Sequence, residues 1–340
     1  MFELLRPLLF LLPPEAAHRA GMLSIRMGAP LLPRPGWDPK LEREILGIRF
    51  PSPVGLAAGF DKHAEAVPHW IKLGFGFCEI GTFTRHPQKG NARPRVWRYP
   101  QAQALINRFG FNNPGADAAA ERLSALKNSG RWPAHPVGIN LGKSKITPEA
   151  EAAEDYLYSL EKLQPFADYI AVNISSPNTP GLRNLQAKGA VKKLVAALAK
   201  KTKKPLFIKF APDMEAKALL ASCEAALAAG AKGLILTNTT LGRDGLGQGP
   251  HPEGGMSGAP LTAKSGAALA AVAKMTRGRV PLIGVGGIMC PEDAARKLDL
   301  GACLVQVYTG FIYRGPGFAG QIARHLSQSM PKWPKAAARR

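Results

Sequence analysis

The stretch YIAVNISSPNTPGLR, residues 169–183, joins an apolar run to a dense group of polar side chains. The run 169–172 is typical of a strand buried on both faces, and two prolines and a glycine then turn the chain away from it. The polar side chains are those of Asn173, Ser175, Ser176, Asn178 and Thr179. Neutral donors and acceptors at the end of a strand suit a planar polar ligand. The alternative is a polar loop without chemistry.

The same pattern repeats along the chain. Short apolar runs alternate with helical patterns, which predicts an α/β protein with a (β/α)8 TIM barrel. The eight runs cover residues 54–59, 75–82, 136–142, 168–176, 205–212, 233–240, 281–288 and 303–310. The clearest helical patterns cover residues 149–163, 214–229, 262–276 and 291–300. A doubly wound sheet is the alternative, but its G-x-G-x-x-G fingerprint follows none of these runs.

Polar and glycine residues gather where these runs end, and barrel active sites form at the carboxyl ends of the strands. Gly286-Gly287 and the turn 308–310 follow the last two strands, where backbone N–H groups can approach a phosphate. Lys209 lies inside an apolar strand and suits a ring that gains negative charge on reduction. A core lysine paired with a carboxylate is the alternative for Lys209.

Amides and aromatic residues occur together in the segment 106–115. This segment suits stacking and hydrogen bonding to a planar heterocycle, although a simple turn into the next helix has the same composition. Asn107, Asn173, Asn178 and Asn238 together would match the alternating N–H and C=O groups of a pyrimidine-type ring. Lys62 could meet a carboxylate of such a ligand.

The composition excludes some classes of protein. The chain has 340 residues, of which 46% are hydrophobic, as in soluble globular proteins. Its net charge of +21 indicates anionic partners, which could be an acidic membrane surface, nucleic acid, or phosphate- and carboxylate-bearing ligands. The four cysteines are far apart, which predicts free thiols in a reducing compartment. No cluster has metal-ligand spacing, so no metal site is expected.

The N-terminus predicts two short helices, over residues 1–12 and 15–27, separated by two prolines. Each is too short to cross a bilayer, and no signal-peptide cleavage site follows. Apolar faces beside arginines suit a membrane interface, whereas a helical hairpin packed on its own domain is the alternative. A Pro- and Gly-rich linker, residues 30–39, follows. We therefore expect an N-terminal extension, residues 1–36, and a barrel domain, residues 37–340.

Nine motifs in this order resemble the dihydroorotate dehydrogenase family. They are AAGFDK (57–62), EIGTFT (79–84), INRFGFNN (106–113), VNISSPNTPGLR (172–183), KFAPD (209–213), TNTT (237–240), SGAPL (257–261), GVGGI (284–288) and VYTGFIYRGP (307–316). The resemblance implies that the chain oxidises dihydroorotate to orotate with FMN in pyrimidine (UMP) biosynthesis.

The resemblance also indicates the class within the family. Class 2 members have an N-terminal helical extension, sit on a membrane and reduce ubiquinone, whereas class 1 members lack the extension and use a cysteine base. Ser176 occupies the position of the base here. The resemblance therefore implies class 2, peripheral on the cytoplasmic face of the cell membrane through the N-terminal helices, with no transit peptide.

The resemblance assigns roles to individual residues, with Ser176 as the catalytic base. The residues implied to contact orotate are Lys62, Asn107, Arg108, Phe109, Gly110, Phe111, Asn173, Asn178, Asn238 and Thr239. Those implied to contact FMN are Ala58, Gly59, Phe60, Asp61, Lys62, Thr82, Asn140, Asn173, Lys209, Thr237, Gly258, Gly287, Tyr308 and Thr309.

Three further features follow from the resemblance. Thr179 and Phe111 would surround a proton outlet. His18 and Arg98 would line a quinone tunnel, although His18 could also be an exposed helix residue. Ala64 stands where glycine is frequent in the family, and we expect it to be tolerated.

Two other functions are kept as alternatives. One is a soluble member of the same family that uses fumarate or NAD, against which Ser176 and the N-terminal helices argue. The other is a basic nucleic-acid-binding protein, which only the net charge supports. No nucleic-acid motif is found, so no nucleic-acid partner is expected.

Overall fold

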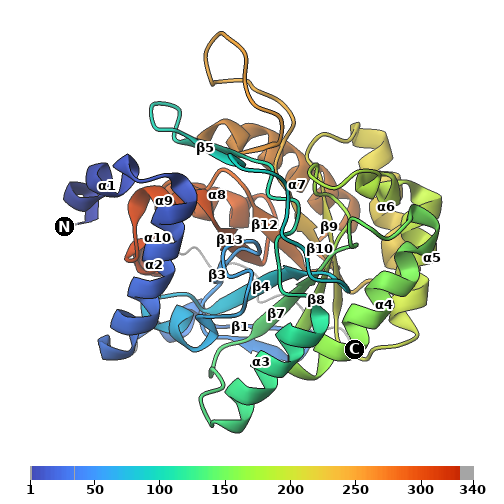
Figure 1. The fold of residues 1–340 in the computed structure, drawn as a ribbon. Coiled ribbons are helices and arrows are strands. Elements are labelled where there is room, and N and C mark those ends of the chain that lie inside the picture. Colours follow the sequence, from blue (N-terminus) through green and yellow to red (C-terminus); the bar gives the residue numbers. More distant parts are fainter. Residues whose placement is uncertain (1, 34, 330–340) are drawn as a thin grey trace.

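The computed structural model describes residues 2–33 and 35–329 (Figure 1). The C-terminal end of the predicted barrel domain, residues 330–340, lies outside the described residues. A closed barrel of eight parallel strands forms the centre, in the order β3-β4-β7-β8-β9-β10-β12-β13. Its strands are β3 (Val54–Leu56), β4 (Phe77–Phe83), β7 (Val137–Leu141), β8 (Tyr169–Asn173), β9 (Leu206–Phe210), β10 (Gly233–Leu236), β12 (Leu282–Val285) and β13 (Leu304–Val307). The predicted fold class is confirmed.

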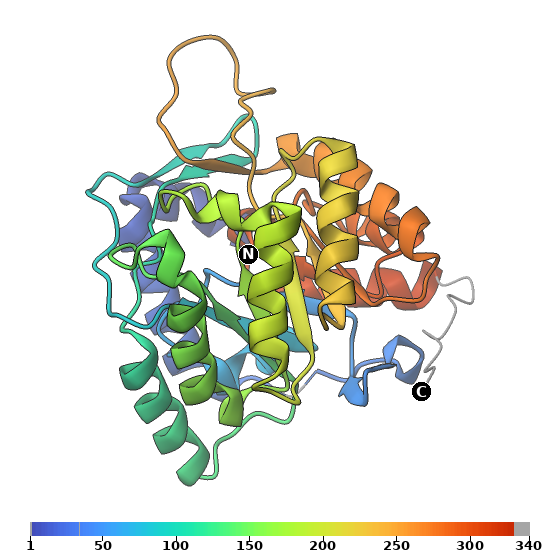
Figure 2. The same cartoon turned by 90° about the vertical axis from the view of Figure 1, so that its right-hand side faces the viewer.

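Helices surround the barrel, and Figure 2 shows several of them side by side over its outer face. They are α3 (Ala116–Asn128), α4 (Ala152–Leu163), α5 (Lys188–Ala199), α6 (Ala216–Ala228), α7 (Thr262–Thr276), α8 (Pro291–Asp299), α9 (Thr309–Arg314) and α10 (Phe318–Ser329). All four clear helical patterns are confirmed. The first βα unit differs, because a 3₁₀ helix, Val67–Leu73, joins β3 to β4 and α10 packs against β3.

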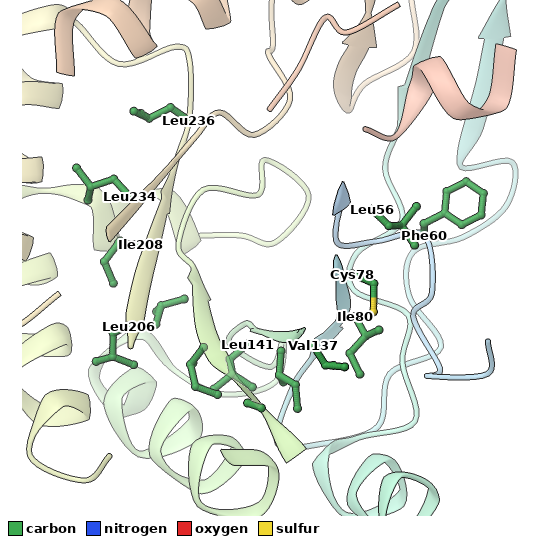
Figure 3. Packing of buried hydrophobic residues seen from close by; sticks show 14 of the residues in the cluster. Leu56, Phe60, Cys78, Ile80, Val137, Leu141, Leu206, Ile208, Leu234 and Leu236 are labelled. Atoms are coloured by element: carbon green, nitrogen blue, oxygen red, sulfur yellow. The ribbon is translucent and has the colours of Figure 1, made fainter. Parts of the chain in front are cut away.

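Side chains alternate along each strand, which builds two apolar layers. Cys78, Ile80, Ile208 and Leu234 point out toward the helices (Figure 3). The alternate positions fill the inside of the barrel, at Phe77, Ala171, Phe207, Ile235 and Ile283 among others. Burial on both faces explains why the strands are nearly continuous apolar runs. Each strand has fewer residues than the run that predicted it, because the rest of each run belongs to the loops before and after the strand.

Two small sheets accompany the barrel. The hairpin of β1 (Arg43–Ile45) and β2 (Ile48–Phe50) adds Ile45 and Phe50 to the interior cluster. A three-stranded sheet of β5 (Val96–Tyr99), β6 (Ala104–Asn107) and β11 (Gly255–Gly258) lies near the carboxyl ends of the strands. The sequence patterns did not predict either sheet.

The predicted N-terminal helices are present as α1 (Phe2–Leu11) and α2 (Pro14–Gly28). Helix α1 contacts α9, and α2 contacts β5. Several large apolar side chains of this region remain exposed, namely Leu4, Leu8, Leu11, Leu23, Met27 and Leu31. Among residues 2–33 and 35–329, no helix is both long and apolar enough to cross a membrane. The four cysteines are free thiols, as predicted, and Cys78 and Cys223 are fully buried.

His135, two residues before β7, is expected to make stability sensitive to acid. Its ring is buried, and neither ring nitrogen has a hydrogen-bond partner among the described residues. Burial lowers the pKa of His135 to about 3, from about 6.5 in an unfolded chain. A depressed folded-state pKa means that this stability is fully present above pH 6.5 and is lost as the pH falls toward 3.

We expect acid to cost the wild type about 2 kcal/mol through this ring between pH 7 and pH 5. His135→Leu should remove that part of the pH dependence, since leucine cannot take up a proton. Urea unfolding at several pH values measures the effect. An equally steep loss of stability in wild type and His135→Leu over this range would contradict the assignment.

Candidate active site

A cavity lies at the carboxyl ends of the barrel strands and collects residues from most of the predicted motifs. Its wall includes many of the residues expected to bind substrate or cofactor. They are Ala58, Gly59, Lys62, Thr82, Asn107, Phe109, Gly110, Phe111, Asn173, Ser176, Asn178, Lys209, Thr237, Asn238, Thr239, Gly258, Gly287, Tyr308 and Thr309. These segments are distant in sequence, and the closed barrel brings them together because parallel strands end at one rim.

Ser176 lies in the loop after β8, where the turn 177–181 directs the chain away from the sheet. Its side chain lines the cavity and is 6% exposed. The backbone N–H of Asn178 donates to Ser176 Oγ at 3.3 Å, which orients the hydroxyl. Arg183 fastens the same loop, since its guanidinium donates to the Ser175 carbonyl and pairs with Asp213 at 3.0 Å. A buried and oriented hydroxyl thus faces the cavity.

Four asparagines at the cavity wall form two hydrogen-bonded pairs. Asn178 Nδ2 donates to Asn107 Oδ1 at 3.2 Å, and Asn238 Nδ2 donates to Asn173 Oδ1 at 3.1 Å. Asn238 also donates to Ser175 Oγ at 2.9 Å. The predicted set of amides is therefore assembled at one place. An amide side chain has both a donor and an acceptor group, which are the two kinds of group that a ring with alternating N–H and C=O groups requires. In the structure, Asn173 and Asn238 direct their N–H groups to protein oxygens.

Lys62 brings positive charge to the same wall. Its Nζ lies 4.3 Å from the centroid of the Phe109 ring. Burial and the nearby Arg95 lower the pKa of Lys62 to about 8, while Glu15 and Asp61 act in the opposite direction. A buried ammonium is costly without an anionic partner. A bound carboxylate would supply such a partner.

Two glycines with left-handed backbone also line the cavity. Gly287 has φ +76°, and a Cβ there would lie 2.3 Å from Thr262 Cα. Gly258 has φ +103°, and a Cβ there would lie 2.1 Å from the Gln103 carbonyl oxygen. Thr309 donates to Ser257 Oγ at 2.8 Å beside them. Such surfaces let a ligand approach main-chain N–H groups closely, as phosphate binding requires.

Five of the residues predicted to contact substrate or cofactor or to surround the proton outlet do not line this cavity. Asp61 is fully buried, and its carboxylate accepts from the backbone of Glu65 and Ala66 and from Trp70 Nε1. Arg108 donates to the Pro94 carbonyl and lies over the Trp97 ring. The other three are Phe60, Asn140 and Thr179. Local hydrogen bonds direct the side chains of Asp61 and Arg108 away from the cavity. The spacing of residues in the sequence does not predict these hydrogen bonds.

Asn140 does not line the cavity itself but hydrogen-bonds to two residues that do. Thr82 Oγ1 donates to Asn140 Oδ1 at 2.6 Å, and Asn173 Nδ2 donates to the same oxygen at 3.3 Å. Thr82 and Asn173 both line the cavity. Asn140 in turn donates to Glu79, a fully buried carboxylate that the sequence reading did not single out. Gln306, another unpredicted residue, lines the cavity.

A second cavity of about 670 Å³ opens between the N-terminal helices and the barrel. Its wall is mainly apolar and includes Phe10, Met22, Ile25, Leu105 and Phe311. Five residues line both cavities, namely Lys62, Asn107, Phe109, Asn112 and Tyr308. The two cavities are therefore separated by single side chains.

His18 and Arg98 both line the second cavity. The His18 ring packs edge-on against Phe60 at a centroid distance of 5.0 Å, and burial lowers its pKa to about 3, so His18 is neutral at pH 7. Arg98 lies over the Phe10 ring and donates to the carbonyls of Leu9 and Leu12, which ties it to the end of α1. His18 is thus not the exposed helix residue of the alternative reading.

An unpredicted ion pair braces this cavity. Arg95 is 5% exposed and binds both carboxylate oxygens of Glu15, at 3.0 and 2.9 Å. Arg95 Nη1 also donates to the carbonyls of Lys89 and Asn91. The pair joins α2 to the segment before β5. Bidentate pairing of this kind fixes orientation as well as distance.

Ala64 adopts a conformation that the sequence alone did not reveal. Its φ is +53°, in the left-handed region that L-residues with a Cβ rarely occupy. The Asp61 carboxylate holds the next two backbone N–H groups and thereby imposes this turn. The expected tolerance of Ala64 therefore comes with backbone strain.

We expect Ala64→Gly to raise the free energy of unfolding by about 0.5 kcal/mol, because relief of the left-handed strain exceeds the lost methyl burial and the added chain entropy. Ala66→Gly is the matched control, since Ala66 is also buried but has φ −124°. Ala66→Gly should destabilise by about 1 kcal/mol. Urea unfolding compares the two, and equal losses in both would rule out strain at Ala64.

Within the described part of the chain, no group of three or more His, Cys, Asp or Glu side chains could hold a metal ion. Two buried polar atoms that belong to cavity residues, Gln306 Oε1 and Asn112 Oδ1, have no hydrogen-bond partner among the described residues. Buried polar atoms are nearly always paired. A polar ligand bound in the cavity would supply partners for these two atoms.

Known proteins match both the sequence and the fold. The family model described as dihydroorotate dehydrogenase matches residues 40–330. The dihydroorotate dehydrogenase (quinone) of Gloeobacter violaceus is 47% identical, over 98% of this chain and 95% of that protein. That of Salinispora arenicola is 50% identical, over 93% and 96%. The ligand-free type DHODH of Eimeria tenella has a TM-score of 0.88 at 37% identity, over 96% of this chain and 98% of that chain.

The fold and the cavity define a TIM-barrel enzyme with its site at the carboxyl ends of the strands. With the family match over most of its length, the chain belongs to the dihydroorotate dehydrogenase family, a family of flavin-dependent oxidoreductases. The resemblance identified from the nine motifs is thereby confirmed.

Proposed function

We propose that this protein oxidises dihydroorotate to orotate with FMN and passes the electrons to a membrane quinone, as a step of pyrimidine biosynthesis. The observation that carries the proposal is the single cavity that joins Ser176, the four asparagines, two lysines and a glycine-lined wall. The relatives of 46–50% identity carry the name dihydroorotate dehydrogenase (quinone), which supports the same acceptor.

The residues present fit FMN. The backbone at Gly258 and Gly287 would hold the phosphate, since both residues line the cavity and neither has a side chain. Lys209, Thr82 and Asn173 would face the ring, with Asn140 behind them. Bound FMN would supply a hydride acceptor for the substrate. The predicted contacts of Asp61 and Phe60 are proposed to involve their backbone, since both side chains are engaged elsewhere.

The substrate would lie against the asparagines, with its carboxylate at Lys62. Ser176 would remove the proton from substrate C5. A serine hydroxyl is a weak base in water, so a closed, oriented setting is needed for this step. The burial of Ser176 and its hydrogen bond from Asn178 support that setting. Thr179, buried three residues further on, and Phe111 are proposed to surround the route by which the proton leaves.

The second cavity is proposed to admit the quinone between α1, α2 and the barrel, past His18 and Arg98. A neutral His18 and an apolar wall suit an uncharged, hydrophobic molecule. The exposed leucines of α1, with Arg19 and Arg26 on α2, suit contact with a membrane surface. We propose residues 1–36 as this membrane-facing extension and a peripheral location on the cytoplasmic face of the cell membrane.

Colour gives a direct test. Purified protein should show flavin absorption that bleaches on addition of dihydroorotate without oxygen. Quinone, fumarate or NAD is then added to the reduced protein, and the rate at which the flavin absorption returns identifies the acceptor. Reoxidation by quinone should be the fastest. Faster reoxidation by fumarate or NAD would favour the soluble alternative. A flavin-free preparation that binds nucleic acid in a salt-sensitive way would replace the proposal altogether.

A further inference from the structure

Glu79 is a charged side chain inside the barrel that the proposed chemistry does not use. It lies in the middle of β4, where the alternation of side chains points it inward, and its exposure is 0%. Burying a carboxylate costs several kcal/mol unless it is paired and hydrogen-bonded. Packing alone therefore does not explain a carboxylate at this position.

Polar groups from four other strands surround the carboxylate. Asn140 Nδ2 donates to Glu79 Oε1 at 2.7 Å, from β7. Gln306 Nε2 and the Tyr169 hydroxyl donate to Oε2 at 2.7 and 3.1 Å, from β13 and β8. Lys209 Nζ, from β9, lies 4.0 Å from Oε1. The carboxylate thus accepts three hydrogen bonds and faces one ammonium.

These partners lead directly to the proposed cofactor site. Lys209 and Gln306 line the cavity, and Asn140 supports Thr82 and Asn173, which also line it. Burial lowers the pKa of Lys209, and the charge of Glu79 opposes that effect. A glutamine in place of Glu79 could accept from Asn140 through its oxygen, but it would not oppose the loss of the lysine's proton. The charge of Glu79 therefore matters chiefly for Lys209.

We propose that Glu79 is a positioning residue that keeps the ammonium of Lys209 charged and fixed at the floor of the cavity, so that a full positive charge is present before the bound ring gains electrons. This inference rests on the proposed function, because it needs a flavin in the cavity. The inference adds a reason why Lys209 stays charged. That reason is Glu79, which does not line the cavity itself but lies beside Lys209, which does.

The test is the pH dependence of the flavin midpoint potential in the holoenzyme, measured by reductive titration with dithionite from pH 6 to 9. An opposite charge within 4–6 Å typically shifts a pKa by about 1–3 units. In Glu79→Gln, Lys209 should lose its proton in the oxidised state and regain it on reduction. Reduction should then take up as much as about one extra proton, which steepens the fall of the potential with pH.

Three variants separate charge from structure. Glu79→Asp should restore the wild-type slope. Tyr169→Phe removes a hydrogen bond to Glu79 without removing its charge, so its slope should match wild type. Combining Lys209→Met with Glu79→Gln should abolish the effect of the glutamine on the slope. Equal slopes in Glu79→Gln and wild type, or a steepening in Tyr169→Phe as large as in Glu79→Gln, would overturn the inference.

The readout also separates this inference from the proposed function. Dithionite reduces the flavin without any substrate, so the slopes can be compared even if dihydroorotate has no effect. A preparation without flavin would overturn both proposals. If Glu79→Gln does not retain flavin, binding of FMN to the stripped Glu79→Gln protein at pH 6 and 9 replaces the titration. Affinity should then fall more with pH than in wild type, and an equal fall in both would overturn the inference.

Discussion

Ser176→Ala should slow the reduction of the flavin by dihydroorotate by about 10²- to 10⁴-fold, the usual contribution of a positioned general base. The side chain faces the cavity with its oxygen oriented by the Asn178 N–H. Alanine leaves this loop in place, because Arg183 fastens it through the Ser175 carbonyl and Asp213. FMN binding should therefore be unchanged. Anaerobic stopped-flow measurement of flavin bleaching gives the rate.

The control for Ser176→Ala is Ser222→Ala, which removes a buried hydroxyl on α6, outside the cavity. Ser222→Ala should bleach at the wild-type rate. Flavin content and thermal unfolding should match among all three proteins. If Ser176→Ala is reduced as fast as wild type, Ser176 is not the base, and the proton must leave to another group of the cavity.

The barrel could be predicted because its strands are buried on both faces. Runs such as 205–210 are then nearly continuous in apolar character, and helical patterns separate them. Once a parallel barrel is inferred, the polar residues that follow each strand must meet at one rim. This topological argument explains why Ser176, Asn173 and Lys209 lie at the wall of one cavity.

The spacing of residues in the sequence did not predict the direction in which individual side chains point. Asp61 follows β3 like any rim residue, but it caps the backbone of Glu65 and Ala66 instead of facing the cavity. Glu79 shows the opposite case. It interrupts an apolar run at an inward position, which was a readable signal of a buried charge, although its partners lie on four other strands.

Long-range pairing was the second unpredicted part. The sheet of β5, β6 and β11 joins Asn107 to Gly255, which are 148 residues apart. Short strands of this kind have too few residues to show a period. The second cavity depends on that sheet, because α2 packs against β5 and Arg95 is held by Glu15. The resemblance named His18 and Arg98 for this region, but neither the ion pair of Arg95 and Glu15 nor the enclosure of the cavity was predicted.

Gly287→Ala should abolish flavin binding and lower the free energy of unfolding by about 2–4 kcal/mol. Two costs add at this position. The backbone has φ +76°, where a side chain is strained, and the new methyl would lie 2.3 Å from Thr262 Cα. The start of α7 must then shift away from residue 287. This shift would also disturb the hydrogen bond that Thr262 Oγ1 donates to the Gly287 carbonyl at 2.8 Å. Flavin absorbance per mole of protein and urea unfolding measure the two losses.

Gly189→Ala is the matched control, because Gly189 lies in helix α5 with open space around its added methyl. Alanine is a better helix former than glycine by about 1 kcal/mol, so this variant should be more stable than wild type and keep its flavin. The same substitution thus has opposite signs at the two sites, and the left-handed backbone with its contact at Thr262 accounts for the difference. A Gly287→Ala protein that purifies with a full complement of flavin would show that this turn is not part of the phosphate site, whatever its stability.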